Sequence, residues 1–156
     1  MASGFRLAFI LCLAGVLLIS ETWSCSQGCP SGWTRYGSRC FRVVTARRNV
    51  ATAERTCIAL GGNLASIHSS GENNFVRGLI FRRYRSYPRT WIGLTDAIQE
   101  RIWMWTDGSR VRFARWGRRE PNNSGNEDCT EINFRRYYWN DEKCHNRRPF
   151  VCARRR

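Results

Sequence analysis

The 156-residue chain has few of the side chains and motifs on which catalysis usually depends. Histidine occurs only at positions 68 and 145, and neither has a motif neighbour that makes it a credible general base. There is no Gly-x-Ser-x-Gly sequence and no glycine-rich phosphate-binding loop. The cysteines do not form paired Cys-x-x-Cys knuckles, which disfavours a zinc site. We therefore expect a binding protein and not an enzyme.

Long apolar runs are missing after the first 19 residues. Near the N-terminus, Arg6 precedes an unbroken apolar or small stretch, Leu7–Ile19, and Thr22-Trp23-Ser24 offers small residues at a cleavage site before Cys25. A secretory signal peptide has this pattern. The alternative is a membrane anchor, but the stretch is short, because a membrane-spanning helix needs about 20 residues. We expect residues 1–24 to be a signal peptide and the mature protein to be secreted, without a membrane span.

The remaining residues, 25–156, are long enough to bury a core and contain no repeat or low-complexity linker, which predicts one domain. Good helix formers at Ala51–Leu60, ended by Gly61-Gly62, predict a helix. Ser70 is expected to cap a second helix, Glu72–Phe81. Strand patterns occur at Leu64–Ile67, Trp91–Leu94, Trp103–Trp105 and Pro149–Cys152, and Asp107-Gly108 is expected to be a turn.

Cysteine usage fits an oxidising compartment. Cys12 lies in the expected signal peptide, and seven cysteines remain after it. The odd number leaves one thiol without an intrachain partner, and spacing alone does not give the connectivity.

Side-chain oxygen donors gather around the last cysteines. Three carboxylates and two amides belong to this cluster: Glu120, Asn122, Glu127, Asn140 and Asp141. Hard oxygen ligands in this number suit Ca²⁺, which accepts six to eight of them. Pro121 follows Glu120, and a cis X-Pro bond, at a cost of about 0.5–1 kcal/mol, would turn the first two side chains toward one point. Because such a cage leaves donors and acceptors for hydroxyl groups, we interpret it as a calcium-dependent sugar site.

Many short motifs, in order, resemble the C-type lectin domain over essentially all of Cys29–Cys152. They are Cys29-Pro30, Gly32-Trp33, Cys40-Phe41, Ala53-Glu54-Arg55, Cys57, Leu64–Ile67, Trp91–Leu94, Trp105, Asp107-Gly108, Cys129, Trp139–Asp141, Cys144 and Phe150–Cys152. The resemblance implies an α+β fold of two helices and two small antiparallel sheets, with a long calcium-binding loop. It also implies three disulfides, Cys29–Cys40, Cys57–Cys152 and Cys129–Cys144, the first of which marks the long form of the domain.

Cys25 has no partner in the family pattern. We expect it to form an interchain disulfide that gives a homodimer, and a capped or free thiol is the alternative. A dimer would strengthen binding to cell surfaces, because single sugar sites are weak and affinity comes from multivalency.

The resemblance also assigns roles to the donor cluster. All five residues would be principal calcium ligands and sugar contacts, and the Glu-Pro-Asn order resembles members that select mannose, fucose and N-acetylglucosamine. The Gln-Pro-Asp order of galactose binders is absent. Asn122 also begins an Asn-x-Ser glycosylation sequon, which we expect to be unused because a cramped loop around an ion is a poor acceptor.

A second, auxiliary calcium site is expected from four further residues that match auxiliary ligands of some family members: Asp96, Glu100, Asn123 and Asp128. The alternative is a merely acidic loop.

Lysine is nearly absent, whereas arginine is abundant. Lys143 is the only lysine among 26 basic residues, against 12 acidic residues, and the formal net charge is +14. Arginine binds sulfate, phosphate and carboxylate through a bidentate fork. Anionic or sulfated glycans and microbial surfaces are therefore expected partners, and nucleic acid is not, although scattered arginines can also serve only solubility. Arg118-Arg119 adjoin Glu120 and are placed to contact an extended glycan or its acidic groups.

The sequence thus predicts a secreted, calcium-dependent lectin that binds mannose-type glycans and recognises or agglutinates cells in innate defence. The alternative is a basic matrix, mineral or antimicrobial protein that acts on the same fold through its arginines. Ice binding is a distant third, because the arginine load argues against a weakly charged ice-binding face.

Overall fold

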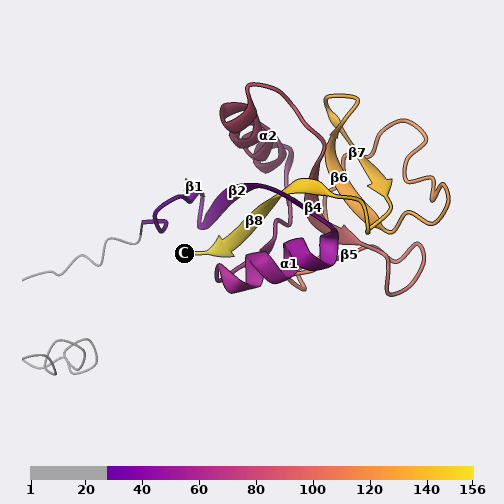
Figure 1. Ribbon diagram of the computed structural model, residues 1–156, viewed down its shortest axis with the longest axis horizontal. Coiled ribbons are helices and arrows are strands. Elements are labelled where there is room, and N and C mark those ends of the chain that lie inside the picture. The colour runs from indigo at the N-terminus through magenta and orange to yellow at the C-terminus, as the bar shows by residue number, and fades with distance from the viewer. Residues whose placement is uncertain (1–27) are drawn as a thin grey trace, which may run out of the picture.

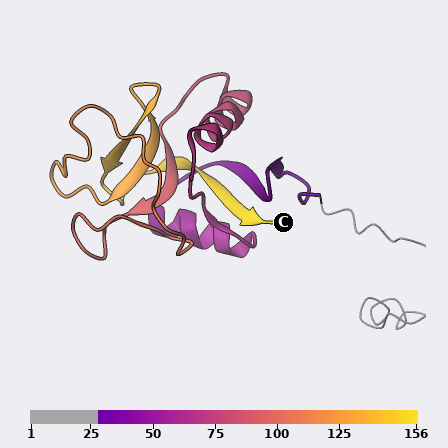
Figure 2. The ribbon, with the colours of Figure 1, turned by 180° about the vertical axis from the view of Figure 1, so that it is seen from behind.

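The computed structural model describes residues 28–156, which Figure 1 shows as two helices on either side of a set of strands. Figure 2 gives the same arrangement from behind. The expected signal peptide, residues 1–24, and Cys25 lie outside the described residues, so both stay predictions. Among the described residues, no helix is long and apolar enough to cross a membrane.

Both predicted helices are present. Helix α1 spans Val50–Ala59, and the Asn49 side chain caps it by accepting the Thr52 N–H at 2.9 Å. Helix α2 spans Ser70–Tyr84, three residues beyond the predicted end. Its N-cap is Ser69, which accepts the Glu72 N–H at 3.1 Å, so the prediction of Ser70 as the cap was wrong by one residue. Two consecutive serines gave the sequence pattern no means to choose between them.

Eight strands follow the order β1-β2-β8-β4-β6-β7, with β3 paired to β8 and β5 paired to β4. Their bounds are β1 Thr34–Tyr36, β2 Arg39–Arg48, β3 Asn63–Leu64, β4 Thr90–Thr95, β5 Met104–Trp105, β6 Cys129–Phe134, β7 Tyr138–Glu142 and β8 Arg148–Arg155. All pairings are antiparallel except that of β4 with β8, which meet in parallel at Trp91 and Phe150. The two antiparallel sheets that the resemblance implies are therefore joined into one mixed sheet, and the α+β fold is confirmed.

Two strand predictions were too long. Of Leu64–Ile67 only Leu64 is in a strand, although all four residues are buried. Ala65 instead bridges the two sheets, because its N–H donates to the Val151 carbonyl at 2.8 Å and its carbonyl accepts the Gly93 N–H at 3.0 Å. The predicted strand Trp103–Trp105 is also shorter in the structure, because β5 begins at Met104 and Trp103 precedes it.

The three disulfides that the resemblance implies are present, Cys29–Cys40, Cys57–Cys152 and Cys129–Cys144. Cys57–Cys152 fastens α1 to β8 across 95 residues of chain. Closing a loop of about that length removes unfolded-state entropy worth roughly 4–5 kcal/mol.

A tryptophan at the centre of the core connects the fold to the long loop. Trp139 is fully buried in β7, and its ring lies 5.9 Å from Trp105, 5.7 Å from Phe113 and 6.0 Å from Trp116. Its backbone is held by the loop as well, because Trp139 N donates to the Arg115 carbonyl at 2.8 Å and its carbonyl accepts the Gly117 N–H at 2.9 Å. The chain leading to Glu120 is thus fixed beside β7.

Candidate calcium and sugar site

The Glu-Pro-Asn segment lies in the long loop between β5 and β6. A tight turn precedes it, in which the Glu120 N–H donates to the Gly117 carbonyl at 3.0 Å. The Glu120–Pro121 peptide bond is cis. The Asn122 amide nitrogen donates to the Glu120 carboxylate, so the two side chains turn toward one point, as expected.

Asp141 in β7 anchors the residues that follow the proline. Its two carboxylate oxygens accept backbone N–H groups from Asn122 at 3.1 Å and from Asn123 at 2.6 Å. Asp141 is fully buried. A buried carboxylate must be compensated, and these two loop N–H groups supply part of that compensation.

Glu127 is bound to the loop residues that follow Asn122. Its carboxylate accepts the Ser124 N–H at 3.1 Å, and the same N–H donates to the Asn122 side-chain oxygen at 2.8 Å. The Glu127 N–H in turn donates to the Asn123 side-chain oxygen at 2.7 Å. The oxygens of Asn122 and Glu127 therefore converge on one backbone N–H, and the loop is folded around its own candidate ligands.

Asn140 is held by a charged network that the sequence did not reveal. Its amide nitrogen donates to Glu131 Oε1 at 3.3 Å and to the Asp141 carbonyl. Glu131 is fully buried and accepts from Arg89 at 2.9 Å and from Arg148 at 3.0 Å. Burial raises the pKa of Glu131, and these two arginines oppose the rise. The sequence analysis did not predict strand β6, in which Glu131 lies among buried residues.

The candidate site concentrates negative charge. Burial raises the pKa of Glu120 and of Glu127, and the nearby charge of Asp141 raises both further. Carboxylates that raise one another's pKa favour a cation in their midst.

The four auxiliary candidates form two contacting pairs, Asn123 with Glu100 and Asp96 with Asp128. Asn123 donates to Glu100 at 2.9 Å, and Thr95 and Asp96 bond to the Asp128 carbonyl at 2.6 and 3.1 Å. Asp96 is 3% exposed, and its Oδ1 has no hydrogen-bond partner. Burial raises the pKa of Asp96, and the charges of Asp128 and Asp141 add to the rise.

These donors fit calcium better than a metal that needs histidine or cysteine. Within residues 28–156, no three histidine, cysteine, aspartate or glutamate side chains form a metal-binding group, and this includes the carboxylates of Glu120, Glu127 and Asp141, so the expected set depends on amide oxygens as well. The expected principal set includes the amides Asn122 and Asn140, which Ca²⁺ accepts as readily as carboxylates. The unpartnered oxygen of buried Asp96 is an unsatisfied acceptor of the kind a hard cation ligates.

Comparison with known proteins identifies the family. The C-type lectin domain model matches residues 46–154, well over half of the chain. The protein is a C-type lectin.

Relatives of this C-type lectin differ in the function their names give. Nattectin of Thalassophryne nattereri, a galactose-specific lectin, is 40% identical over 147 residues, 94% of this chain and 92% of its own. Herring type II antifreeze protein has a TM-score of 0.76 at 32% identity and aligns over 82% of this chain and 99% of its own. The carbohydrate-recognition domain of cow CD23, solved in the presence of a GlcNAc2Man3 oligosaccharide, has a TM-score of 0.74 at 28% identity, over 83% of this chain and 97% of its own.

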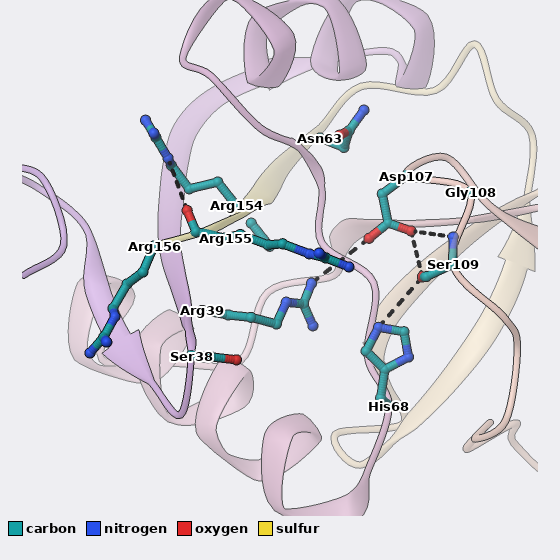
Figure 3. Close-up of a pocket in the computed structure, with 11 residues that line it drawn as sticks. Ser38, Arg39, Asn63, His68, Asp107, Gly108, Ser109, Arg154, Arg155 and Arg156 are labelled. Atoms are coloured by element: carbon teal, nitrogen blue, oxygen red, sulfur yellow. Dashed lines mark hydrogen bonds and ion pairs between the residues drawn. The ribbon is translucent and has the colours of Figure 1, made fainter. Parts of the chain in front are cut away.

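The lectin also has a cavity of about 910 Å³ away from the Glu-Pro-Asn segment, lined in part by His68, Asp107 and Ser109 (Figure 3). A serine, a histidine and an aspartate together invite comparison with a hydrolase triad. Here the carboxylate accepts from Ser109 Oγ at 2.5 Å and from Ser66 Oγ at 2.5 Å, and the histidine reaches Ser109 only at 3.5 Å. In a triad the aspartate orients the histidine, whereas Asp107 binds the two serines. The His68 ring also lies 3.1 Å from Ser66 Oγ, and the hydrogen bonds of Asp107 hold the turn after β5.

Proposed function

We propose that this C-type lectin binds mannose-, fucose- or N-acetylglucosamine-type glycans in a calcium-dependent way. The observation that carries the proposal is the convergence of Glu120, Asn122 and Glu127 around the loop backbone that buried Asp141 holds. With Asn140, these residues would hold the principal ion, and Asp96, Glu100, Asn123 and Asp128 an auxiliary one.

The roles of the side chains follow from their hydrogen-bonding capacity. Calcium, when bound, supplies coordination positions for two neighbouring sugar hydroxyls. Glu120 is an acceptor only and would accept a hydrogen bond from one hydroxyl, whereas the Asn122 amide would donate a hydrogen bond to the other. This polarity, set by the order Glu-Pro-Asn, selects the hydroxyl geometry.

The name of nattectin points to another sugar, galactose. We base the sugar class on this chain's own residues 120 and 122, because they decide which hydroxyl is offered a donor and which an acceptor.

We further propose that the protein is secreted, has no catalytic role and recognises or agglutinates cells in innate defence. A disulfide between two copies through Cys25 would present two sugar sites to one surface, which raises avidity without any new contact.

A second candidate function is supported by the charge. With a net charge of +14, the chain would adhere to anionic surfaces through its arginines even without a sugar site. The two functions respond to different conditions, because calcium-held sugar needs the ion, whereas contacts between exposed charges are screened by salt.

The test is retention of the secreted protein on mannose–agarose at moderate salt with calcium. Elution by EDTA and by free mannose, but not by free galactose, is the expected result. Tight, salt-sensitive retention on heparin together with no retention on mannose would instead favour the arginine-driven function.

A further inference from the structure

Three arginines form a small cavity next to the proposed sugar site. Arg118, Arg119 and Arg135 line this arginine cavity, which has a volume of about 250 Å³. All three residues are exposed. In the part of the chain that the structure describes, none of them forms an ion pair, whereas Arg39, Arg89 and Arg148 all bind carboxylates.

The first two arginines occupy the tip of the turn that delivers Glu120. The hydrogen bond from Glu120 to Gly117 makes Arg118 and Arg119 its central residues. Arg119 has a φ of 70°, in the left-handed region where a turn favours glycine or asparagine. For a residue with a Cβ, this conformation is unfavourable.

The third arginine is presented in the same way by another turn. The Tyr137 N–H donates to the Phe134 carbonyl at 3.2 Å, which closes the β6–β7 hairpin around Arg135 and Arg136. Their φ angles are 42° and 72°, at positions that hairpins usually give to asparagine and glycine. Two independent turns thus place arginine where the backbone favours smaller residues, and both face one cavity. Backbone hydrogen bonds close both turns without any contribution from the guanidinium groups. The feature that the two turns share is therefore the positive charge of their arginines.

Close backbone approach brings the two turns together. A Cβ added at Gly117 would lie 3.0 Å from Phe134 Cδ1 and 3.3 Å from Glu120 Cγ, so a larger residue there would require these side chains to shift by a few tenths of an ångström. The Arg135 guanidinium lies 5.0 Å from the centre of the Phe134 ring. Arg119, which lines the cavity, directly precedes Glu120, so the cavity adjoins the proposed sugar site.

The chemistry of the arginine cavity points to an acidic group. Guanidinium forks bind the oxygens of sulfate, phosphate and carboxylate in pairs, and these charge-assisted hydrogen bonds are about twice as strong as neutral ones. A neutral hydroxyl gains no comparable charge attraction from three unpaired cations.

We propose that the arginine cavity is a subsite for an acidic group on the glycan held at the neighbouring site. The lectin then prefers mannose-type glycans that carry a sulfate, phosphate or carboxylate over their neutral counterparts. This inference rests on the proposed function, because the sugar held by Glu120 and Asn122 brings the acidic group to the arginines.

The experiment measures binding of the full secreted chain, with calcium at moderate salt, to four mannobiosides. One is neutral, and the others carry a sulfate, a phosphate or a carboxylate on the outer sugar. Two variants remove cavity charge, Arg118→Gln/Arg119→Gln and, separately, Arg135→Gln. The matched control is Arg82→Gln/Arg83→Gln, an adjacent exposed pair in α2 that loses the same charge as the first variant.

At least one acidic mannobioside should bind about tenfold more tightly than the neutral one, and comparison of the three identifies the acidic group. Both cavity variants should lower the affinity for that ligand toward the neutral value, while neutral binding and the control stay unchanged. Equal binding of all four ligands by the wild type would overturn the subsite and leave the sugar site standing. The subsite would also be overturned if the cavity variants and the control lost equal affinity for the acidic mannobioside. Failure of every mannobioside to bind would overturn the proposed function, and the subsite with it.

Discussion

The carboxylate of Asp141 accepts the backbone N–H of Asn123 at 2.6 Å, across 18 residues of sequence. Asp141 is fully buried in β7, whereas Asn123 lies at the exposed tip of the long loop. One side chain therefore fixes the loop conformation and, in our proposal, also ligates calcium. Folding of the loop and binding of the ion should consequently be coupled.

Replacing Asp141 with Asn tests this coupling. The amide keeps one acceptor oxygen for the loop but removes a negative charge and one of the two acceptors. We expect calcium affinity to fall by tenfold or more, as is typical when a ligand loses its charge. A calcium titration followed by the fluorescence of Trp139 and its aromatic neighbours measures the effect. Asp107→Asn, in the turn after β5, is the control and should leave calcium affinity unchanged.

Exchange of Glu120 and Asn122 for Gln and Asp should move sugar preference from mannose to galactose. The double variant keeps one carboxylate and one amide but reverses which position donates to a hydroxyl and which only accepts. Competition by free mannose and free galactose on immobilised glycan gives the ratio directly, and we expect at least a tenfold change. An unchanged ratio with intact calcium binding would show that residues other than these two decide the sugar.

Much of the site was predictable because it is local in sequence. Glu120, Asn122 and Glu127 lie within eight residues, and a proline between the first two already indicated how they would meet. Glu131 was not predictable, because its partners Arg89 and Arg148 come from other parts of the chain and meet only when β4, β6 and β8 pair. In a chain with 26 basic residues, no pattern marks which arginines are buried against a carboxylate.

The arginine cavity beside Glu120 was only partly predictable, for the same reason. Sequence adjacency placed Arg118 and Arg119 near the site, but Arg135 reaches them only through the β6–β7 hairpin and the bare backbone of Gly117. The positive φ angles of Arg119 and Arg135 are equally invisible in a pattern, because turns usually signal them with glycine or asparagine.

Glu131→Gln should destabilise the fold. The variant leaves Arg148, which is mostly buried, facing a neutral amide on one side while Glu142 still pairs with it at 3.0 Å, so we expect a loss of about 1–3 kcal/mol. Urea denaturation with calcium chelated measures the loss without any contribution from the ion. Glu142→Gln is a milder comparison, because Glu142 binds the other side of Arg148 at 3.0 Å but is more exposed than Glu131. A smaller loss for Glu131 than for Glu142 would contradict the central place given to the buried carboxylate.

Acid should release the sugar well before it unfolds the protein. The pKa values of Glu120 and Glu127 are raised above the ordinary 4.5, chiefly by burial and next by Asp141, so both take up protons at a higher pH than exposed glutamates. A protonated carboxyl group is a poor calcium ligand, and binding is therefore lost as the pH falls. Raising the calcium concentration should shift the midpoint to lower pH, because ion and proton compete for the same oxygens.

Asp107 explains why the fold should survive that acidification. Burial alone would raise its pKa, but hydrogen bonds from Ser109 and Ser66, together with Arg39, outweigh burial and hold the pKa below the ordinary 3.8. A depressed pKa contributes stability that is fully present above the unfolded-state value and disappears only as the pH falls through the folded-state value. Between neutrality and about pH 4.5, near the ordinary pKa of glutamate, near-UV circular dichroism should therefore stay native while retention on mannose–agarose declines. Simultaneous loss of both signals would mean that acid acts on the fold and not on the calcium ligands.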